Sequence, residues 1–511
     1  GNGKSGTDSI GTNDNSTIIV DSNATILGNV YGGGNYGATG INSSSNSNYS
    51  NISLLGGTIK GNVYGGGNNN GASTSSKEFK VNITLNGGLV EGSIYGGSRT
   101  KGTVYGDVAL NLLSGTVRTS CYGGGEGGYQ SSSSPGTFVT GEVKIITGIE
   151  NESNENLKIE NAIYGGSAFG TVNGASNSTT ISSKNTNIEV LSGTINSVFG
   201  GGEGNGTYTP YVLGNVAVDI KGGIIDNVYG GSDQRGTPNG SVTVNVHGGK
   251  ITNAYAGGNQ TEVSEPNINF YGGTTTNGYG GGNQAKVDIS HVLLNGGTVT
   301  NLFGASNTSG DVTTSNVNVK SGKVTNVYGG NNIGGTTNTS NVSIDGGDVT
   351  DVYGGGRETD IVSATNVNLN NRATNVFGGS DQKGTVHTSY ININDGIADS
   401  VYGGNNLGGT TVNSNVTVTG GIITSIYGGG LEAETTTSNL NIIHGKIDYL
   451  FGGGKSAGVI TTHLNLNKGY IKNIFGGSNV LGNVTTTNIK NTPQELESNS
   501  NLYADVSFDT S

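Results

Sequence analysis

Hydrophobic and polar residues alternate along most of this chain in short segments, such as NVNV at 316–319, NVSI at 341–344 and NVTV at 415–418. An alternation with a period of two places one face of a β-strand in a core and the other in solvent. A second apolar segment follows each alternating one after a GG or SG pair, as in KVTNVYGG at 323–330. No segment has the sustained 3.6-residue period of an amphipathic helix, so the pattern predicts an all-β chain.

An aromatic residue followed by glycines marks the end of each second segment. It occurs seventeen times, at Tyr31, Tyr64, Tyr95, Tyr122, Tyr164, Phe199, Tyr229, Tyr255, Tyr279, Phe303, Tyr328, Tyr353, Phe377, Tyr402, Tyr427, Phe451 and Phe475. From Tyr255 onward the steps are 24 or 25 residues, whereas earlier steps run from 26 to 42. One such unit cannot bury its own apolar face, but stacked copies can. We therefore predict a single-chain parallel β-solenoid (β-helix) of about 17 coils, with 24–25 residues in each regular coil.

The spacing divides the chain into four parts. These are an N-terminal lead segment at 1–18, an irregular solenoid half with loop insertions at 19–254, a regular solenoid half at 255–489, and a C-terminal tail or cap at 490–511. A period of 74 residues, or three coils, lies over the regular half, because the same spacing separates Tyr229, Phe303, Phe377 and Phe451. This super-repeat indicates that a rod was lengthened by duplication of a three-coil block.

The glycines after the aromatic residue predict the corner of each coil. A corner uses positive φ, which glycine adopts easily, and stacked corners leave no room for a Cβ atom. The position two residues before the aromatic is Asn or Asp in ten of the seventeen coils. Identical amides stacked at strand spacing can hydrogen-bond to one another. We therefore predict an Asn ladder of Asn29, Asn62, Asn227, Asn253, Asn277, Asn301, Asn326, Asp351, Asn375 and Asn473. The alternative is that Asn only tolerates the turn geometry.

Insertions in the irregular half mostly follow the glycine runs, so we expect them at one corner of the coil. Insertions on one face of a repeat array are often its binding face. Their aromatic side chains could offer flat apolar surfaces to sugar rings. The candidate glycan contacts are Tyr36, Tyr49, Tyr129, Tyr208 and Tyr211. The alternative is that each aromatic folds back to close its own loop.

Composition narrows the function classes. The formal net charge is −12 and no basic stripe occurs, which argues against binding of nucleic acid. No apolar run reaches the length of a membrane helix, so we expect no membrane insertion. The single cysteine, Cys121, stands where other repeats carry Val or Ile, which predicts a buried thiol and no internal disulfide.

Motifs for catalysis, metals and cofactors are incomplete. GNGKSGT shares only G-K-S with a phosphate-binding loop. YGGSDQ is similar to a calcium-binding repeat, but a calcium array needs Asp in every repeat, and the equivalent position in other coils is often Asn, Arg or Ala. A polysaccharide lyase or hydrolase needs clustered carboxylates, but Glu358 and Glu432 are three coils apart. We interpret the best local cluster, Arg357, Glu358 and Asp360, as a solvated corner. We therefore expect no catalytic residues, no metal ligands and no cofactor.

The [VI]YGGG units with their NVxV strands resemble Gly/Asn-rich β-solenoid repeat arrays of bacterial cell-surface proteins, of the adhesin and appendage type. The resemblance covers about 19–489 and brings no catalytic residues with it. Such arrays serve as stalks, adhesive rods or fibres outside the cell. The resemblance implies that this chain is not an enzyme but an extracellular structural rod, acting as a surface stalk, adhesin or fibre-forming subunit.

Two other functions remain open at this point. The first is a carbohydrate-binding adhesin that uses the aromatic insertions of the first half, and the second is a polysaccharide lyase or hydrolase. The expected partners are a second copy of the chain joined end to end, flanking domains, or surface glycans.

Overall fold

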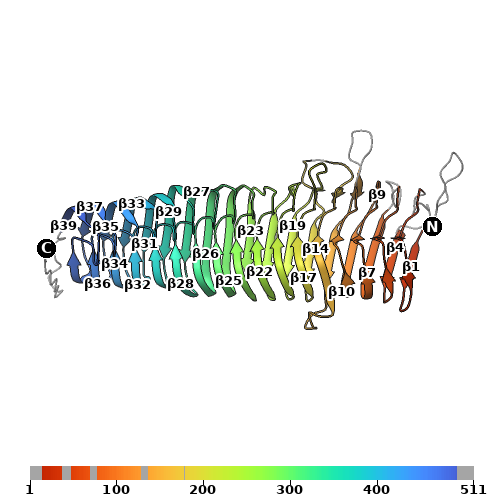
Figure 1. Cartoon of the computed structure of the whole chain (residues 1–511), viewed down its shortest axis with the longest axis horizontal. Helices are drawn as coiled ribbons and strands as arrows, with labels where there is room; N and C mark the ends of the chain where they lie inside the picture. The colour runs from red at the N-terminus through yellow and green to blue at the C-terminus, as the bar shows by residue number, and fades with distance from the viewer. Residues whose placement is uncertain (1–13, 37–47, 70–77, 128–135, 178, 492–511) are drawn as a thin grey trace. The chain divides into compact units, whose positions relative to one another are not determined.

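The computed structural model describes residues 14–36, 48–69, 78–127, 136–177 and 179–491, and the chain forms two compact units. The first unit extends to Ile268 and adds residues 273–275, and the second contains residues 269–272 and those from Thr276 onward. Within the described ranges every regular element is a β-strand and no helix occurs. In each unit the strands lie side by side as successive rungs (Figure 1).

Each coil of the first unit contributes an alternating strand and then a stem strand that ends at the aromatic residue. The alternating strands are β1 (Ser16–Val20), β4 (Asn48–Leu54), β7 (Phe79–Val90), β10 (Val108–Val117), β13 (Val143–Thr147), β16 (Thr186–Val190), β19 (Val216–Ile220) and β21 (Val242–Val246), of which β7 and β10 continue into the stem. The stem strands are β2 (Thr25–Ile26), β3 (Val30–Tyr31), β5 (Thr58–Ile59), β6 (Val63–Tyr64), β8 (Ile94–Tyr95), β11 (Cys121–Tyr122), β14 (Leu157–Tyr164), β17 (Thr194–Phe199), β20 (Ile224–Tyr229) and β22 (Lys250–Tyr255).

The second unit repeats this plan with longer strands. In β25 (Val287–Phe303) and β26 (Val312–Tyr328) the alternating and stem segments form one strand. The later alternating strands are β27 (Thr337–Ile344), β29 (Ile361–Leu369), β31 (Thr385–Ile393), β33 (Thr410–Val418), β35 (Glu434–Ile442), β37 (Val459–Leu466) and β39 (Val484–Asn491). The later stems are β28 (Asp348–Tyr353), β30 (Arg372–Phe377), β32 (Ile397–Tyr402), β34 (Ile422–Tyr427), β36 (Lys446–Phe451) and β38 (Tyr470–Phe475). Strands β23 (Pro266–Phe270) and β24 (Thr274–Tyr279) contain the residues where the chain passes between the units.

Each strand pairs in parallel with the equivalent strand of the next coil, so equivalent residues form columns. In the first unit Ile188 lies opposite Val218 and Phe199 opposite Tyr229. In the second unit Val317 lies opposite Val342. Inward-facing Val, Ile and Leu of both strand types are buried and form the core. This topology confirms the predicted all-β parallel solenoid.

The insertions of the first unit form a second, smaller sheet. Its four parallel strands are β9 (Gly102–Val104), β12 (Thr137–Val139), β15 (Thr171–Val172) and β18 (Tyr211–Val212). The sequence analysis treated these segments as loops, because strands of two or three residues are too short to show a period. Phe138 and Val139 of β12 are buried, so these insertions add to the packed interior.

The glycines after the aromatic residue are required by the closeness of the next coil. A Cβ at Gly329 would lie 2.2 Å from the Gly354 carbonyl oxygen, and one at Gly330 would lie 2.9 Å from the Gly356 nitrogen. None of the glycines at these two positions has a positive φ; the positive values belong to other turns, for example 92° at Gly322. The prediction that these corner glycines use positive φ was therefore wrong, and crowding alone explains them.

The three-coil super-repeat also shows in the third residue after each aromatic, at the corner of the coil. Ser306, Asn331 and Gly356 occupy this position in successive coils, and Ser380, Asn405 and Gly430 occupy it again 74 residues later. Asn405 is fully buried, and its Oδ1 accepts from the Ser380 backbone nitrogen at 2.9 Å and from Thr411 Oγ1 at 3.0 Å. Its Nδ2 donates to the carbonyls of Gly384 and Gly408 at 2.8 and 3.0 Å. In these two blocks a small side chain (Ser), a large one (Asn) and a glycine thus follow one another in successive coils.

Asn405→Ala should remove all four of these hydrogen bonds and leave buried backbone groups without partners. We expect the free energy of unfolding of the second unit to fall by about 2–4 kcal/mol, because each unsatisfied buried group costs about 1–3 kcal/mol. The measurement is guanidinium-induced unfolding followed by circular dichroism. Asn413→Ala is the matched control, since Asn413 is half-buried and its side chain has no hydrogen bond within the described residues. Equal losses in both variants would contradict this account of the corner.

Candidate functional site: the tyrosine groove

The aromatic residues form a stacked column in each unit. Ring centroids from Tyr31 to Tyr255 are 4.6–5.0 Å apart, with interplanar angles of 3–8°. From Tyr279 to Phe475 the spacing is 4.6–4.9 Å and the angles are 6–10°. Most of the rings are buried, and so are most of the apolar residues that directly precede them. Stacking at this distance is the offset face-to-face arrangement that aromatic pairs prefer.

The tyrosine hydroxyls follow a rule that reaches across coils. In the pairs given next, the hydroxyl bonds to the residue four positions after the aromatic in the coil two steps further on. The pairs are Tyr64–Glu126, Tyr122–Glu203, Tyr164–Asp233, Tyr279–Asn332, Tyr328–Asp381 and Tyr427–Asn479. The residue type at this position varies from coil to coil, which is usual for a position that faces water. Instead, Asn332, Asp381 and Asn406 are only 7%, 8% and 9% exposed.

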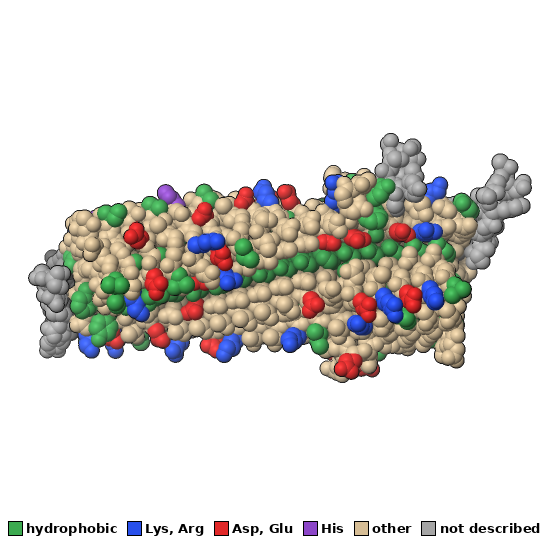
Figure 2. Space-filling model, viewed as in Figure 1, with side chains coloured by type: hydrophobic (Ala, Val, Ile, Leu, Met, Phe, Trp, Pro, Cys, Tyr) green, Lys and Arg blue, Asp and Glu red, His purple; other side chains and the backbone are tan. Residues whose placement is uncertain are grey.

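We use the name tyrosine groove for the surface along each aromatic column. One side is the ladder column, two residues before each aromatic, and the other is the border column, four residues after it. In Figure 2 a line of hydrophobic side chains runs across the rungs, and acidic side chains lie along its border. The groove therefore combines phenol hydroxyls with amides on one side and variable charged or amide groups on the other.

Hydrogen bonds link the predicted Asn ladder in three stretches. Nδ2 of Asn253 donates to Asn227 Oδ1 at 3.0 Å in the first unit. In the second unit Asn301 donates to Asn277 at 2.9 Å, and Asn326 donates to Asn301 at 2.8 Å. Asn375 Nδ2 donates to Asp351 Oδ1 at 2.8 Å. Amide or carboxylate side chains of this column therefore pair between several consecutive coils, as an Asn ladder requires.

Three predicted ladder residues bond differently. The side chains of Asn29 and Asn62 donate to the hydroxyls of Tyr31 and Tyr64, each at 2.9 Å. Their Oδ1 atoms accept from the backbone nitrogen of the next coil, at Asn62 and Ser93. Asn473 follows Tyr449 in the column and donates to the Asp448 carbonyl at 3.4 Å. A ladder of amide side chains does not form at these three positions.

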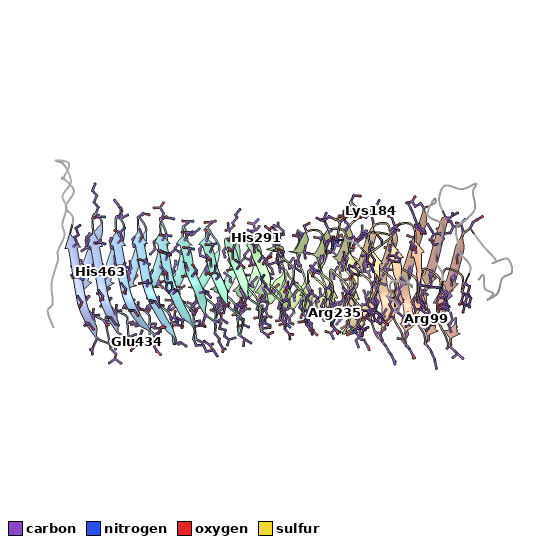
Figure 3. The ribbon with its side chains drawn as sticks, turned by 90° about the horizontal axis from the view of Figure 1, so that it is seen from above. Arg99, Lys184, Arg235, His291, Glu434 and His463 are labelled. Carbon is purple, nitrogen blue, oxygen red and sulfur yellow. The ribbon has the colours of Figure 1, made fainter. Side chains whose placement is uncertain are left out.

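Carboxylates gather along the border column of the first unit. Burial raises the pKa of Glu203, and the neighbouring charge of Asp233 raises it further, against the hydrogen bond from Tyr122 at 2.7 Å. Burial and the same carboxylates raise the pKa of Tyr122 and Tyr164. Arg99 is the basic residue of this border, and its Nε lies 3.7 Å from Glu126 Oε2. Figure 3 shows Arg99 and Arg235 on the side of the unit opposite Lys184.

In the second unit the groove opens into a cleft of about 300 Å³. Its lining is Asn301, Asn326, Tyr328, Tyr353, Arg357, Asp381 and Gln382. The Asp381 carboxylate accepts from the Tyr328 hydroxyl at 3.2 Å and from Asn406 Nδ2 at 2.8 Å. With the Gln382 amide oxygen turned toward it, the Arg357 guanidinium donates from Nε at 3.1 Å and from Nη2 at 3.2 Å. Burial and the Asp381 charge raise the pKa of both tyrosines.

The predicted glycan contacts do not meet in one place. Tyr36 is 41% exposed and Tyr49, in β4, is 37% exposed. Tyr208 packs against Phe169, with ring centroids 5.6 Å apart, and Tyr211 lies in the short strand β18. Tyr129 lies outside the described residues. The residues that do meet are those of the groove, which the sequence pattern does not reveal because 52–81 residues separate the partners.

The other residues singled out by sequence take structural places. Cys121 is fully buried, which confirms the predicted core thiol, and burial raises its pKa. Glu358 pairs with Lys383 at 2.9 Å, and Asp360 Oδ1 accepts from the Thr385 backbone nitrogen at 2.7 Å. Arg357 points instead to Gln382 in the cleft. Arg357 therefore lines the cleft, whereas Glu358 and Asp360 bond to Lys383 and Thr385 outside its lining.

The described residues contain neither a metal-binding cluster nor a membrane-spanning helix. Among the described residues, no three His, Cys, Asp or Glu side chains come close enough to share a metal ion. No helix in the described part of the chain is long and apolar enough to span a membrane. No protein-family model, curated protein or solved structure matches the chain.

Glu203→Gln should stabilise the first unit at neutral pH. The raised pKa means that the folded state holds this proton more tightly than the unfolded state, so ionisation of Glu203 opposes folding above both pKa values. The gain should vanish as the pH falls through the raised pKa toward 4.5, the ordinary value. Thermal unfolding of both proteins across this pH range measures the difference.

Glu160→Gln is the control, because its hydrogen bond from Lys158 at the surface lowers the pKa of Glu160. This variant should show no gain at neutral pH. A Glu203→Gln protein that is less stable than the parent at neutral pH would show that the Tyr122 hydrogen bond outweighs the burial of charge.

Proposed function

We propose that this chain is an extracellular structural β-solenoid that acts as a surface stalk, adhesin or fibre-forming subunit. The observation that supports it is the unbroken column of stacked rings in each unit, repeated on every coil at the spacing of the strands. The chain devotes its repeated positions to holding neighbouring coils together. Cohesion along the stack is the property that a load-bearing surface protein needs.

Backbone hydrogen bonds between coils carry most of this cohesion. Every parallel strand pair uses its N–H and C=O groups between neighbouring coils, and the glycine run continues the ladder, with Gly354 N donating to Phe377 O at 2.9 Å. Two neighbouring coils can separate only by breaking all of these bonds together. The resulting cooperativity resists local unfolding and the entry of proteases.

A column of buried hydroxyls adds a connection within the coils of the second unit. Ser389 Oγ donates to the Gly403 carbonyl at 2.5 Å, and Ser414 Oγ donates to the Gly428 carbonyl at 2.7 Å. Both serines are fully buried. Their hydrogen bonds join the alternating strand to the glycine corner across the interior, which supports a structural role for each coil.

Surface exposure tests the proposed location. Antibodies raised against the purified chain should label intact cells of the source organism in immunogold microscopy, and external protease should remove the label. An antibody to a cytosolic protein, applied to the same cells, controls for leakage. Labelling that requires permeabilised cells would exclude a role at the cell surface.

Loss of one stacked ring tests the mechanical role. Tyr402 is 3% exposed and lies between Phe377 and Tyr427 at 4.7 and 4.8 Å, so Tyr402→Ala should cost about 3–5 kcal/mol and lower the unfolding force. Single-molecule force spectroscopy on the full chain measures that force. Tyr390→Ala is the matched control, because Tyr390 is 42% exposed in the same unit. A force unchanged in both variants would remove the stack from the mechanism.

A further inference from the structure

We propose that the cleft at Arg357 and Asp381 binds a neutral saccharide through its hydroxyl groups. The proposal goes beyond the structural role, and it does not use the aromatic insertions of the first unit. It rests on three observations: the composition of the cleft, its charge balance, and the replacement of its charged residues in the next three-coil block.

The cleft offers hydrogen-bond donors and acceptors side by side. Arg357 can only donate, the Asp381 carboxylate can only accept, and Asn301, Asn326 and Gln382 can do both. The guanidinium uses two of its five N–H groups on Gln382, and its other groups have no partner among the described residues. A hydroxyl group is both donor and acceptor. A vicinal diol can therefore accept from the guanidinium with one oxygen and donate to the carboxylate with the other.

The charge balance favours a neutral ligand. Arg357 and Asp381 occupy the border column in consecutive coils and offset each other's charge. The first unit carries Glu203 and Asp233 at the corresponding pair of positions, and there burial and the neighbouring Asp233 charge raise the pKa of Glu203. An anionic ligand would meet the Asp381 carboxylate in the cleft, and a cation would meet the guanidinium.

The tyrosines contribute their hydroxyl edges. Tyr328 and Tyr353 stack on each other with centroids 4.9 Å apart, and further rings cover their outer faces. Sugar rings cannot stack on faces that are already covered. Recognition in the cleft therefore depends on hydrogen bonds, which agrees with a lining made almost entirely of polar side chains.

The next three-coil block keeps the fold but loses this chemistry. YGGGRE at 353 returns as YGGGLE at 427, and FGGSDQ at 377 is replaced by FGGGKS at 451. Leu431, Lys455 and Ser456 thus stand where the cleft has Arg357, Asp381 and Gln382. The structural tyrosines return as Tyr402 and Tyr427. The cleft residues are therefore not needed for the coil, and the chain itself shows that leucine fits at the position of Arg357.

Arg357→Leu is the deciding variant. The probes are neutral, sialylated and sulfated oligosaccharides printed on a glycan array, followed by isothermal titration of the purified chain with the neutral glycan that gives the strongest signal. We expect the parent chain to bind neutral glycans and Arg357→Leu to lose at least tenfold in affinity. Circular dichroism and the melting temperature should stay unchanged, because Leu431 occupies the equivalent site.

Two further variants report on specificity. Asp381→Asn keeps an oxygen for the Tyr328 hydroxyl but leaves the guanidinium uncompensated, so it should shift array binding toward sialylated and sulfated glycans. Arg372→Leu is the matched control and should bind like the parent, because Arg372 is exposed at the start of β30 and the next coil carries Ile397 in its column.

Three results would overturn the proposal. They are an array with no signal on neutral glycans, a parent signal confined to acidic glycans, and an Arg357→Leu protein that binds like the parent. Binding lost in Tyr208→Ala but kept in Arg357→Leu would assign the glycan to the insertions instead. None of these results bears on the structural role, which the cell-surface and force measurements test separately.

Discussion

Neighbouring coils within each unit lie one strand spacing apart, and this short distance decides which side chain each column can hold. Flat rings satisfy it by stacking at 4.6–5.0 Å, and amides satisfy it by pairing, as Asn326 does with Asn301 at 2.8 Å. Glycine satisfies it where the next coil's backbone fills the space of a Cβ, as at Gly329. The columns of like residues are therefore a consequence of parallel stacking in register.

The same constraint acts at the buried corner, where the order of residue types repeats after three coils. At this corner the Asn405 side chain occupies the space above Gly379 of the preceding coil, where a Cβ would lie 1.9 Å from Asn405 Oδ1. Asn405 in turn satisfies the Ser380 backbone nitrogen one coil earlier. Serine, asparagine and glycine follow one another in this order at 306, 331 and 356 and again at 380, 405 and 430, and duplication of a three-coil block preserves that order.

The tyrosine groove is where a uniform scaffold becomes variable. The aromatic column repeats in every coil. The border column instead carries Glu126, Glu203 and Asp233 in the first unit and Arg357 and Asp381 in the second. A border carboxylate is held at its base by the coil and at its tip by a tyrosine hydroxyl two coils away. It can therefore change charge while the backbone ladder remains intact. A structural solenoid can in this way present different chemistry along its length.

Sequence alone determined the strands, the parallel solenoid and the coil length, because a period of two and a repeated glycine corner are local properties of the chain. It also located the ladder column, although Asn29, Asn62 and Asn473 bond to a tyrosine or to backbone instead. Only the tertiary structure decided that the rings are buried, that crowding selects the corner glycines, and that insertions form a second sheet. It alone brought Tyr328 to Asp381 and Arg357 to Gln382, since these partners lie in different coils and meet only when coils stack in register.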